Sequence, residues 1–338
     1  MRGLAKERPE RGLSIVTRDR PSAGRNELLV RVNVCGICGT DLAHYQWQSY
    51  ARGHVALGRV LGHEFVGVVV EAGPDTKISV GARITADSDL GCGVCWFCRR
   101  GMWNNCDSQS RIGSHRDGGL AEYVVVPERS AIVIPEQMPD KFATLLEPFG
   151  AASHAVHVFP NLVGKAAAVI GPGPVGLLAG VMLRDAGCSP VLVSGLAEDS
   201  HRLEVAAKLG LDPGDAETLS RIAAELPGAG VDVVVDAVGN VGSLQQGVGL
   251  ARFGGEISIV GVGGSGEFSP FSLVEKGLTV RGIWRRVPES WDRLLAVAQR
   301  HPEMSLIVDG EYRLDDFELA FKALEERRHV KTVIRLGD

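Results

Sequence analysis

Four cysteines in one short segment are the clearest chemical signal in the chain. Cys92, Cys95, Cys98 and Cys106 are separated by two, two and seven residues. Zinc binds four thiolates in tetrahedral geometry, and two-residue spacers let successive side chains converge on one ion. We therefore expect a structural zinc site, because four protein ligands leave no open position for water. An iron–sulfur cluster is the alternative, but the last spacing is seven and no proline follows Cys106.

Two further residues of ligand type lie earlier in the chain. Cys38 is in the segment 35–41, Cys-Gly-Ile-Cys-Gly-Thr-Asp, and His63 is in 62–64, Gly-His-Glu. Neither is informative alone, since a single histidine is more often a hydrogen-bonded structural residue than a ligand. Cys35 and Cys38 have the spacing of a redox pair, but no thioredoxin-like strand–helix–strand pattern surrounds them.

A glycine-rich turn follows a short apolar run in the middle of the chain. The turn Gly171-Pro172-Gly173-Pro174-Val175-Gly176 lies between the apolar run 166–170 and a helical pattern over 177–186. This is the context in which Gly-x-Gly-x-x-Gly binds a dinucleotide. Gly171 permits the tight turn, Gly173 lets the backbone approach the pyrophosphate, and Gly176 permits close helix–strand packing. Pro174 and Val175 lie at the helix N-terminus, whose unpaired N–H groups favour phosphate.

The next strand bears on the choice between NAD and NADP. In NAD-binding chains this strand commonly ends in Asp or Glu, which holds the ribose 2′-OH, whereas Gly195 stands here. Glu198 or Asp199 can supply that acid from the following loop. Alternatively, Ser194, Gly195 and Arg202 accept the 2′-phosphate of NADP. Both cofactors stay open, and we favour NAD.

Later strands end in residues placed to complete a nucleotide cleft. Val238 follows the strand over 231–235, and Val260 and Val262 lie at the end of the strand over 256–260. Ligands bind at the carboxyl ends of parallel strands, so we expect these valines beside the nicotinamide half of the cofactor. Simple strand-ending turns are the alternative.

The elements that carry these residues fall into two groups. Short β-branched runs over 28–34, 65–70 and 123–126 dominate the first 150 residues. Strands over 166–170, 191–193, 231–235, 256–260 and 278–282 then alternate with helical patterns, which indicates a parallel sheet buried on both faces. Helices over 291–299 and 317–326 and a strand over 330–335 follow. We predict an α/β protein with a β-rich domain over 1–149, to which 287–338 return, and a doubly wound domain over 150–286.

Composition limits the classes of protein that are possible. The chain has 338 residues, 45% hydrophobic and 23% charged, which suits two globular domains. Its net charge of −5 and the absence of an apolar run of about 20 residues argue against nucleic-acid and membrane partners. The first eight residues have no apolar core, so we expect no secretory signal. Four of the seven cysteines are clustered, which favours metal binding in a reducing cytoplasm.

Taken in order, these motifs resemble the zinc-dependent medium-chain dehydrogenases of the alcohol dehydrogenase superfamily. The resemblance rests on 35–41, 62–64 with Gly67, Gly73 and Gly81, the four-cysteine segment and the glycine turn, and it covers nearly the whole chain. It implies a GroES-like catalytic domain and a Rossmann domain. Residues 146–150, Leu-Glu-Pro-Phe-Gly, match the position where the threonine and sorbitol (polyol) dehydrogenase branch carries a carboxylate.

The resemblance also implies a second metal centre, and thus two Zn²⁺ per chain. By this carry-over Cys38, His63 and Glu147 hold the catalytic zinc. Glu64 is an alternative ligand or a group behind the metal. Three protein ligands leave one open position, as a Lewis-acid site requires.

The same resemblance assigns roles to three residues of the segment after Cys38. Thr40 is similar to the family hydroxyl that carries the substrate proton outward. Asp41 is expected to hydrogen-bond His63 and fix its orientation. His44 continues the proton relay unless it is an ordinary surface histidine.

The activity that follows is oxidation of a secondary alcohol to its ketone, or the reverse, by hydride transfer with NAD or NADP. A polyol or a threonine-like amino alcohol is the expected substrate. Trp47 resembles a tryptophan of threonine dehydrogenases, but Ala43 stands where those enzymes usually carry a histidine. Alternatives are a zinc-free quinone or enoyl reductase and a non-catalytic NAD(P)-binding relative.

We also expect a homo-oligomer, a dimer or tetramer, paired through a sheet edge near Phe268–Leu273.

Overall fold

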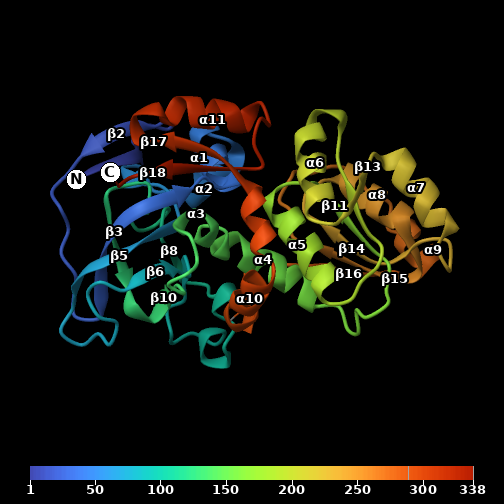
Figure 1. Cartoon of the computed structure of the whole chain (residues 1–338), viewed down its shortest axis with the longest axis horizontal. Helices are drawn as coiled ribbons and strands as arrows, with labels where there is room; N and C mark the ends of the chain where they lie inside the picture. Colours follow the sequence, from blue (N-terminus) through green and yellow to red (C-terminus); the bar gives the residue numbers. More distant parts are fainter. Residues whose placement is uncertain (288, 338) are drawn as a thin grey trace. The chain divides into compact units, whose positions relative to one another are not determined.

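The structure is a computed structural model that describes residues 1–287 and 289–337 (Figure 1). Within these residues the chain divides into two compact units, Met1–Glu147 with Val308–Asp338, and Pro148–Ile307. The chain re-enters the first unit at Val308 rather than at residue 287, because α10 (Glu289–Arg300) and η5 (Pro302–Ile307) belong to the second unit. Ion pairs from Arg300 and His301 to Asp185 fix this segment there.

The main sheet of the first unit has the strand order β10-β6-β5-β3-β18-β17, with β9 also paired to β3. The predicted strands over 28–34, 65–70 and 123–126 are present in β3, β5 and β9. Most of β3 is buried, and Leu28, Val30 and Val32 belong to the hydrophobic core of this unit. The strands are β3 (Glu27–Gly36), β5 (Glu64–Ala72), β6 (Arg83–Ala86), β9 (Tyr123–Pro127), β10 (Ala131–Val133), β17 (Val308–Arg313) and β18 (Lys331–Arg335).

The C-terminal strand lies beside the segment that leads to Cys38. β18 pairs antiparallel with β3, Val333 opposite Gly36, and the Ile37 N–H donates to the Thr332 carbonyl at 2.9 Å. β5 pairs with the other edge of β3, and its first residue, Glu64, is opposite Gly36. The sheet therefore brings the start of β5 and the start of β18 to the same end of β3.

Shorter elements surround this sheet. Tyr45 of α1 stacks on Phe321 of α11 with ring centroids 4.7 Å apart, which joins the two helices. The helices are α1 (Gly39–Gln46), α2 (Ser49–His54), α3 (Asp140–Ala143) and α11 (Phe317–Glu325), and the 3-10 turns are η1 (Cys98–Arg100), η2 (Trp103–Asn105), η3 (Glu128–Ser130) and η6 (Leu314–Asp316). The remaining strands are β1 (Arg2–Lys6), β2 (Ser14–Thr17), β4 (Arg59–Val60), β7 (Asp89–Leu90) and β8 (Ser110–Arg111).

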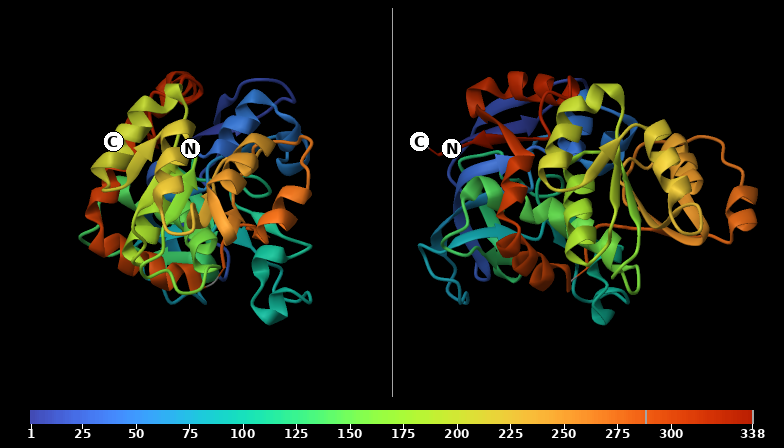
Figure 2. Two further views of the ribbon diagram at one scale, coloured as in Figure 1. Left: turned by 90° about the vertical axis from the view of Figure 1, so that its right-hand side faces the viewer. Right: turned by 45° about the vertical axis from the view of Figure 1, so that its right-hand side comes forward.

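The second unit contains a parallel sheet with the order β13-β12-β11-β14-β15-β16, the order of a doubly wound dinucleotide-binding fold. Figure 2 shows helices on both faces of this sheet. The predicted α/β fold, with a GroES-like and a Rossmann-type part, is therefore confirmed. The elements are β11 (Ala167–Ile170), α5 (Pro174–Asp185), β12 (Val191–Ser194), η4 (Ala197–Asp199), α6 (Ser200–Lys208), β13 (Asp212–Gly214), α7 (Ala216–Glu225), β14 (Val231–Asp236), α8 (Val241–Leu250), β15 (Ala251–Ile259), α9 (Phe271–Lys276) and β16 (Thr279–Gly282).

The sheet edge differs from the prediction. Phe271–Lys276 forms helix α9, so Phe268–Leu273 is not an edge strand. The edge strand on this side of the sheet is β16, whose residues are mostly exposed. Pro270 and the glycine-rich segment before it break the β pattern, and Phe271–Lys276 has no residue that interrupts a short helix.

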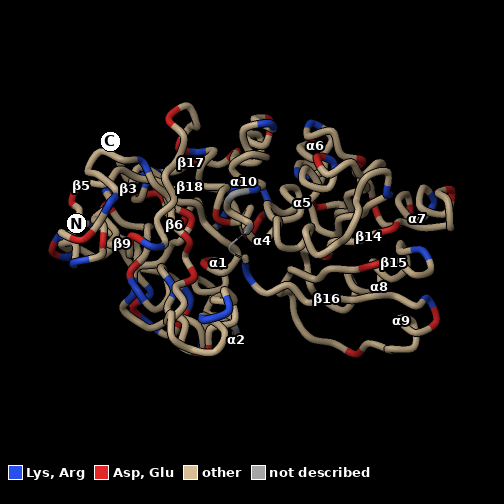
Figure 3. Tube along the Cα trace, turned by 90° about the horizontal axis from the view of Figure 1, so that it is seen from below, with Lys and Arg blue, Asp and Glu red and all other residues tan. Residues whose placement is uncertain are grey.

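Charged residues of both signs are interspersed along both units (Figure 3). In the described part of the chain, no helix is long and apolar enough to cross a bilayer.

Candidate functional site

The four cysteines converge as their spacing predicts. The Sγ atoms of Cys92, Cys95, Cys98 and Cys106 all lie within 4.8 Å of one another, and none is in a disulfide. Backbone N–H groups point at the sulfurs, among them Cys95 N to Cys92 Sγ at 3.3 Å and Cys98 N to Cys95 Sγ at 3.4 Å. Gly93 and Gly101 have positive φ, 80° and 76°, where the loop reverses.

The chemistry of this cluster fits a divalent cation. Hydrogen bonds from the N–H groups of Val94 and Cys95 lower the pKa of Cys92 to about 7. Burial instead raises the pKa of Cys98 to about 12, so the thiols do not all ionise together. A bound cation removes this conflict, and four sulfur donors form the set that structural zinc prefers.

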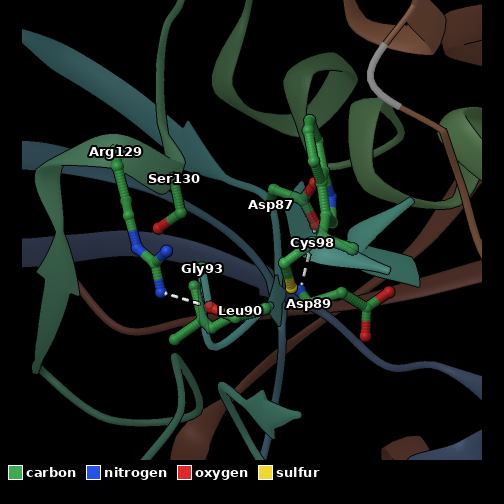
Figure 4. A pocket seen from close by; sticks show the side chains of 9 residues that line it. Asp87, Asp89, Leu90, Gly93, Cys98, Arg129 and Ser130 are labelled. Atoms are coloured by element: carbon green, nitrogen blue, oxygen red, sulfur yellow. Dashed lines mark hydrogen bonds between the residues drawn. The ribbon is translucent and has the colours of Figure 1, made fainter. Parts of the chain in front are cut away.

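A cavity of about 300 Å³ lies against the four-cysteine loop (Figure 4). Asp87, Asp89, Cys98 and Arg129 are among the residues that line it. Arg129 donates a 2.6 Å hydrogen bond to the carbonyl of Gly91 and so holds the base of the loop. The cavity borders the cluster that we expect to be structural.

A second cluster combines sulfur, nitrogen and oxygen donors. Cys38, His63 and Glu64 each offer one ligand atom, and these atoms lie within 4.8 Å of one another. Cys38 immediately precedes α1, and His63 and Glu64 stand at the start of β5. Residues from two loops at one end of β3 therefore meet, although 24 residues separate Cys38 from His63.

The electrostatics of this cluster favour a cation. Burial acts to lower the pKa of His63, but the charges of Asp41 and Cys38 outweigh it and raise the pKa to about 10. Glu147 acts in the same direction. The site therefore holds an excess of negative charge, and a thiolate, an imidazole and a carboxylate form a suitable zinc donor set.

The two carboxylates near this cluster have different partners. Glu64 belongs to the compact group of donors and forms a buried ion pair with Lys331. Glu147, at the start of α4 (Leu146–His157), does not fall within the same 4.8 Å group, but its charge acts on His63 and on Glu64. Its Oε1 accepts a 2.6 Å hydrogen bond from Ser88.

The residues expected to assist the metal occupy different environments. Asp41 does not hydrogen-bond His63 directly: its Oδ1 lies 3.9 Å from Nδ1 of His63, and its Oδ2 accepts from Cys38 N at 2.9 Å. Asp41 faces back toward the start of its own helix, so its effect on His63 is that of a nearby charge. Thr40 is half-buried. His44 is buried on α1 and is not a surface histidine, and burial lowers its pKa to about 4.

The glycine turn of the second unit has the geometry that a phosphate-binding loop requires. Gly171 has φ +95°, a conformation that L side chains rarely adopt. A Cβ at Gly176 would overlap the carbonyl oxygen of Gly171, whereas a Cβ at Gly173 would meet nothing within 4 Å. Gly173 is the N-cap of α5, and Pro174 and Val175 form its first turn, which exposes N–H groups to an anion.

The loop after β12 holds its acidic residues in distinct ways. Asp199 is buried, accepts from Leu196 N at 3.1 Å and lies 3.5 Å from Arg202. Asp199 therefore caps the loop rather than folding back toward a ribose, whereas Glu198 is exposed. Ser194 is buried and its Oγ accepts a 2.6 Å hydrogen bond from Gln246, and Gly195 follows it at the end of the strand.

The Val238 loop lies beside the glycine turn, and the loop at Gly261 lies beside the Val238 loop. A Cβ at Gly171 would come 2.6 Å from Cγ2 of Val238, so these segments are in contact. Asp236 holds the Val238 loop through a 2.9 Å hydrogen bond from the Val238 N–H. Val260 is half-buried, whereas Val262 is exposed.

Sequence reasoning did not single out three buried polar residues: Ser88, Lys331 and Asp236. Lys331 carries a usable signal, because a lysine beside Val330 and two residues before Val333 interrupts an apolar strand. Ser88 carries no such signal, because only the fold places it against Glu147.

Comparison with known proteins agrees with this architecture. Residues 24–136 match the family model of the alcohol dehydrogenase GroES-like domain, and residues 174–300 match that of the zinc-binding dehydrogenases. L-threonine 3-dehydrogenase of Shewanella woodyi is 31% identical over 341 residues, which cover 99% of both chains. A putative zinc-binding dehydrogenase of Sinorhizobium meliloti bound to NADP has a TM-score of 0.89 and 31% identity, covering 99% of this chain and 98% of the other. The 2R,3R-butanediol dehydrogenase of Bacillus subtilis has a TM-score of 0.88 and 26% identity over 99% of both chains.

A GroES-like unit with clustered metal donors and a doubly wound unit with a glycine turn together define a nucleotide-linked oxidoreductase. The chain belongs to the zinc-binding alcohol dehydrogenase family. It is accordingly an oxidoreductase of the zinc-type alcohol dehydrogenase class.

Proposed function

We propose that this chain is a zinc-dependent dehydrogenase that interconverts a secondary alcohol and its ketone with NAD or NADP. The gathering of Cys38, His63 and Glu64 within 4.8 Å, with the charge of Glu147 also acting on His63, carries the proposal. Polyols and threonine-like amino alcohols are the first substrates to test. Relatives named L-threonine 3-dehydrogenase and 2R,3R-butanediol dehydrogenase support that choice.

The two sets of ligands imply different roles for the two metal centres. We assign Cys38, His63 and Glu147 to the catalytic ion, and the four clustered cysteines to a structural ion. Zinc in the first centre supplies Lewis acidity, which makes an alcohol hydroxyl more acidic. NAD or NADP, when bound, would supply the acceptor for the hydride of the carbinol carbon.

Side chains of this protein carry the hydroxyl proton of the alcohol away from the metal centre. Thr40, two residues beyond Cys38 and half-buried, accepts the hydroxyl proton through its Oγ1 and passes it outward. His44, one helical turn later, lies on the same helix face. Because burial lowers its pKa to about 4, His44 stays neutral near pH 7 and relays a proton without storing it. Asp41 supports His63 by its charge.

The dinucleotide binds through the glycine turn and the loop after β12 in this proposal. Gly171, Gly173 and Gly176, with Pro174 and Val175, receive the pyrophosphate at the start of α5. Asp199 already accepts a hydrogen bond from the Leu196 N–H and pairs with Arg202. Glu198 is therefore the acid that can bind a ribose 2′-OH. Arg202, Ser194 and Gly195 favour a 2′-phosphate, so the loop accommodates either NAD or NADP.

An absorbance assay of cofactor reduction tests the proposal. Zinc-loaded protein is assayed with NAD and with NADP against polyols, amino alcohols and simple alcohols. Turnover of a secondary alcohol with two zinc ions per chain supports it. Cofactor binding without turnover of any of these alcohols would instead favour a non-catalytic relative. Light scattering of the same preparation tests the predicted dimer or tetramer.

A further inference from the structure

A histidine between α10 and η5 lies between two carboxylates of the second unit. Nε2 of His301 is 2.8 Å from Oδ1 of Asp185, and its Nδ1 is 2.9 Å from Oε1 of Glu303. The three side chains are 16%, 19% and 33% exposed, so water screens these contacts only in part. Asp185 belongs to α5 and Glu303 to η5, so the imidazole ring connects the end of α10 and η5 to α5.

Two arginines share these carboxylates with the ring. Arg300, the last residue of α10, donates to Asp185 at 3.1 and 2.7 Å. Arg184 of α5 donates a 2.8 Å hydrogen bond to Oε1 of Glu303, and its Nη2 lies 3.4 Å from Nδ1 of His301. Nδ1 therefore faces both an acceptor, Glu303, and a donor, Arg184, whereas Nε2 faces the acceptor Asp185.

The protonation state of His301 decides which of these contacts are hydrogen bonds. A carboxylate only accepts, and a neutral imidazole carries one N–H, whereas an imidazolium carries two. The imidazolium therefore donates to both Asp185 and Glu303. The neutral ring pairs at both nitrogens only as the Nε2–H tautomer, which donates to Asp185 and accepts from Arg184 at Nδ1. The other neutral tautomer would place a lone pair of Nε2 against the Asp185 carboxylate.

We propose that His301 is a pH-sensitive contact that holds η5 against α5 when protonated and loosens η5 when it loses its proton. Histidine changes charge between about pH 5 and 8, so the change of partner at Nδ1 falls in that range. The stabilisation from the His301–Glu303 bond is complete below this titration and is lost as pH rises through it. The bond from Nε2 to Asp185 is present in both states.

The position of η5 in the chain gives this contact its importance. η5 is the last segment of the second unit before the chain enters the first unit at Val308. Met304 and Ile307 of η5 are buried, and Arg184 binds Glu303 in both states. Deprotonation of His301 therefore loosens the segment without detaching it, so the change is a local opening.

Hydrogen–deuterium exchange of the full-length protein tests the proposal. It is measured on residues 301–307 between pH 6 and pH 9 and corrected for the intrinsic exchange rate. In the wild type we expect protection of this segment to fall by about tenfold as pH rises. Glu303→Gln should flatten the profile, because an amide can accept from Nδ1–H and can also donate to a neutral Nδ1. His301→Asn should be flat at the lower protection.

His329→Asn is the matched control. His329 is also a partly buried histidine near a carboxylate, with Nδ1 3.9 Å from Oδ1 of Asp309, but it belongs to the first unit. Its replacement should leave the profile of residues 301–307 as in the wild type.

Two results would overturn the proposal: a wild-type profile that does not change with pH, or a fall in protection that persists in His301→Asn. If His301→Asn does not fold, Glu303→Gln decides, because a flat profile supports the proposal and an unchanged fall overturns it. The measurement involves no metal, cofactor or substrate, so its outcome does not depend on the proposed function.

Discussion

Ser88 Oγ donates a 2.6 Å hydrogen bond to Oε1 of Glu147, and both side chains are buried. The residues on either side of Ser88 face elsewhere: Asp87 and Asp89 line the cavity beside the four-cysteine loop (Figure 4). Residues 87–89 thus line the cavity beside the four-cysteine loop with two side chains and bind a candidate catalytic ligand, Glu147, with the third.

Replacing Ser88 by Ala should affect the metal centre more than the fold. Loss of one buried hydrogen bond costs about 1 kcal/mol of unfolding free energy, whereas loss of a group that orients a ligand lowers metal affinity or activity by about 10–100-fold. Zinc affinity and kcat are the measurements. Ser130→Ala is the matched control, because Ser130 is also buried and donates one hydrogen bond, to the Pro127 carbonyl at 2.9 Å. Equal turnover in the two variants would show that Ser88 does not position Glu147.

Substitutions at the two cysteine sites should separate stability from activity. Cys95→Ser removes one of four converging sulfurs and should lower Tm, at about 2–4 °C for each kcal/mol lost in a unit of this size. Cys38→Ala should abolish turnover with little change in Tm. Calorimetry, zinc analysis and the absorbance assay are run on both. If Cys95→Ser lost activity while its Tm stayed unchanged, the four-cysteine cluster would not be a structural site.

Two glycines of the same turn should respond differently to alanine. At Gly176 a Cβ would overlap the Gly171 carbonyl oxygen, so Gly176→Ala should lower stability and abolish cofactor binding. At Gly173 nothing lies within 4 Å, so Gly173→Ala should fold normally. Because its methyl group would stand where we place the pyrophosphate, its affinity for NAD(P)H should still fall, by about tenfold or more. Thermal unfolding and fluorescence titration separate the effects, and normal cofactor affinity in Gly173→Ala would contradict the assignment of the phosphate site.

The contacts of Asp185 with Arg300 and His301 should make the free energy of unfolding of the second unit depend on pH in the acid range. The hydrogen bond from Arg300 lowers the pKa of Asp185 below its ordinary 3.8, and the bond from His301 adds to this against the opposing effect of burial. The folded state therefore prefers the carboxylate. This stabilisation is complete above the unfolded-state pKa near 3.8 and is lost as pH falls through the lower folded-state pKa.

Asp185→Asn should consequently lower the free energy of unfolding at pH 7 by about 1–3 kcal/mol and flatten its decline in acid. Chemical denaturation between pH 7 and pH 3 measures both effects. Asp75→Asn is the comparison, because the Arg25–Asp75 pair is exposed and should contribute little. A parallel decline of Asp185→Asn and wild type in acid would exclude Asp185 as the source.

The four-cysteine spacing, the glycine turn and the alternation of strands and helices were enough to predict both units. These features are local: each depends on residues close in sequence, whose periodicity or spacing limits the backbone to few conformations. The strand pattern over 166–282 thus predicted a parallel sheet, although the short β13 and the helices α7 and α8 were not singled out. The edge near Phe268–Leu273 was wrong because short apolar segments fit a helix and a strand equally well.

Only the tertiary structure decided which polar side chains meet. Lys331 reaches Glu64 because β18 pairs with the far end of β3, and Ser88 reaches Glu147 across 59 residues of chain. The direction of Asp41 and the burial of His44 were likewise set by packing around α1. Such contacts depend on strand register and on the desolvation of charges, and neither is encoded in the spacing of residues along the sequence.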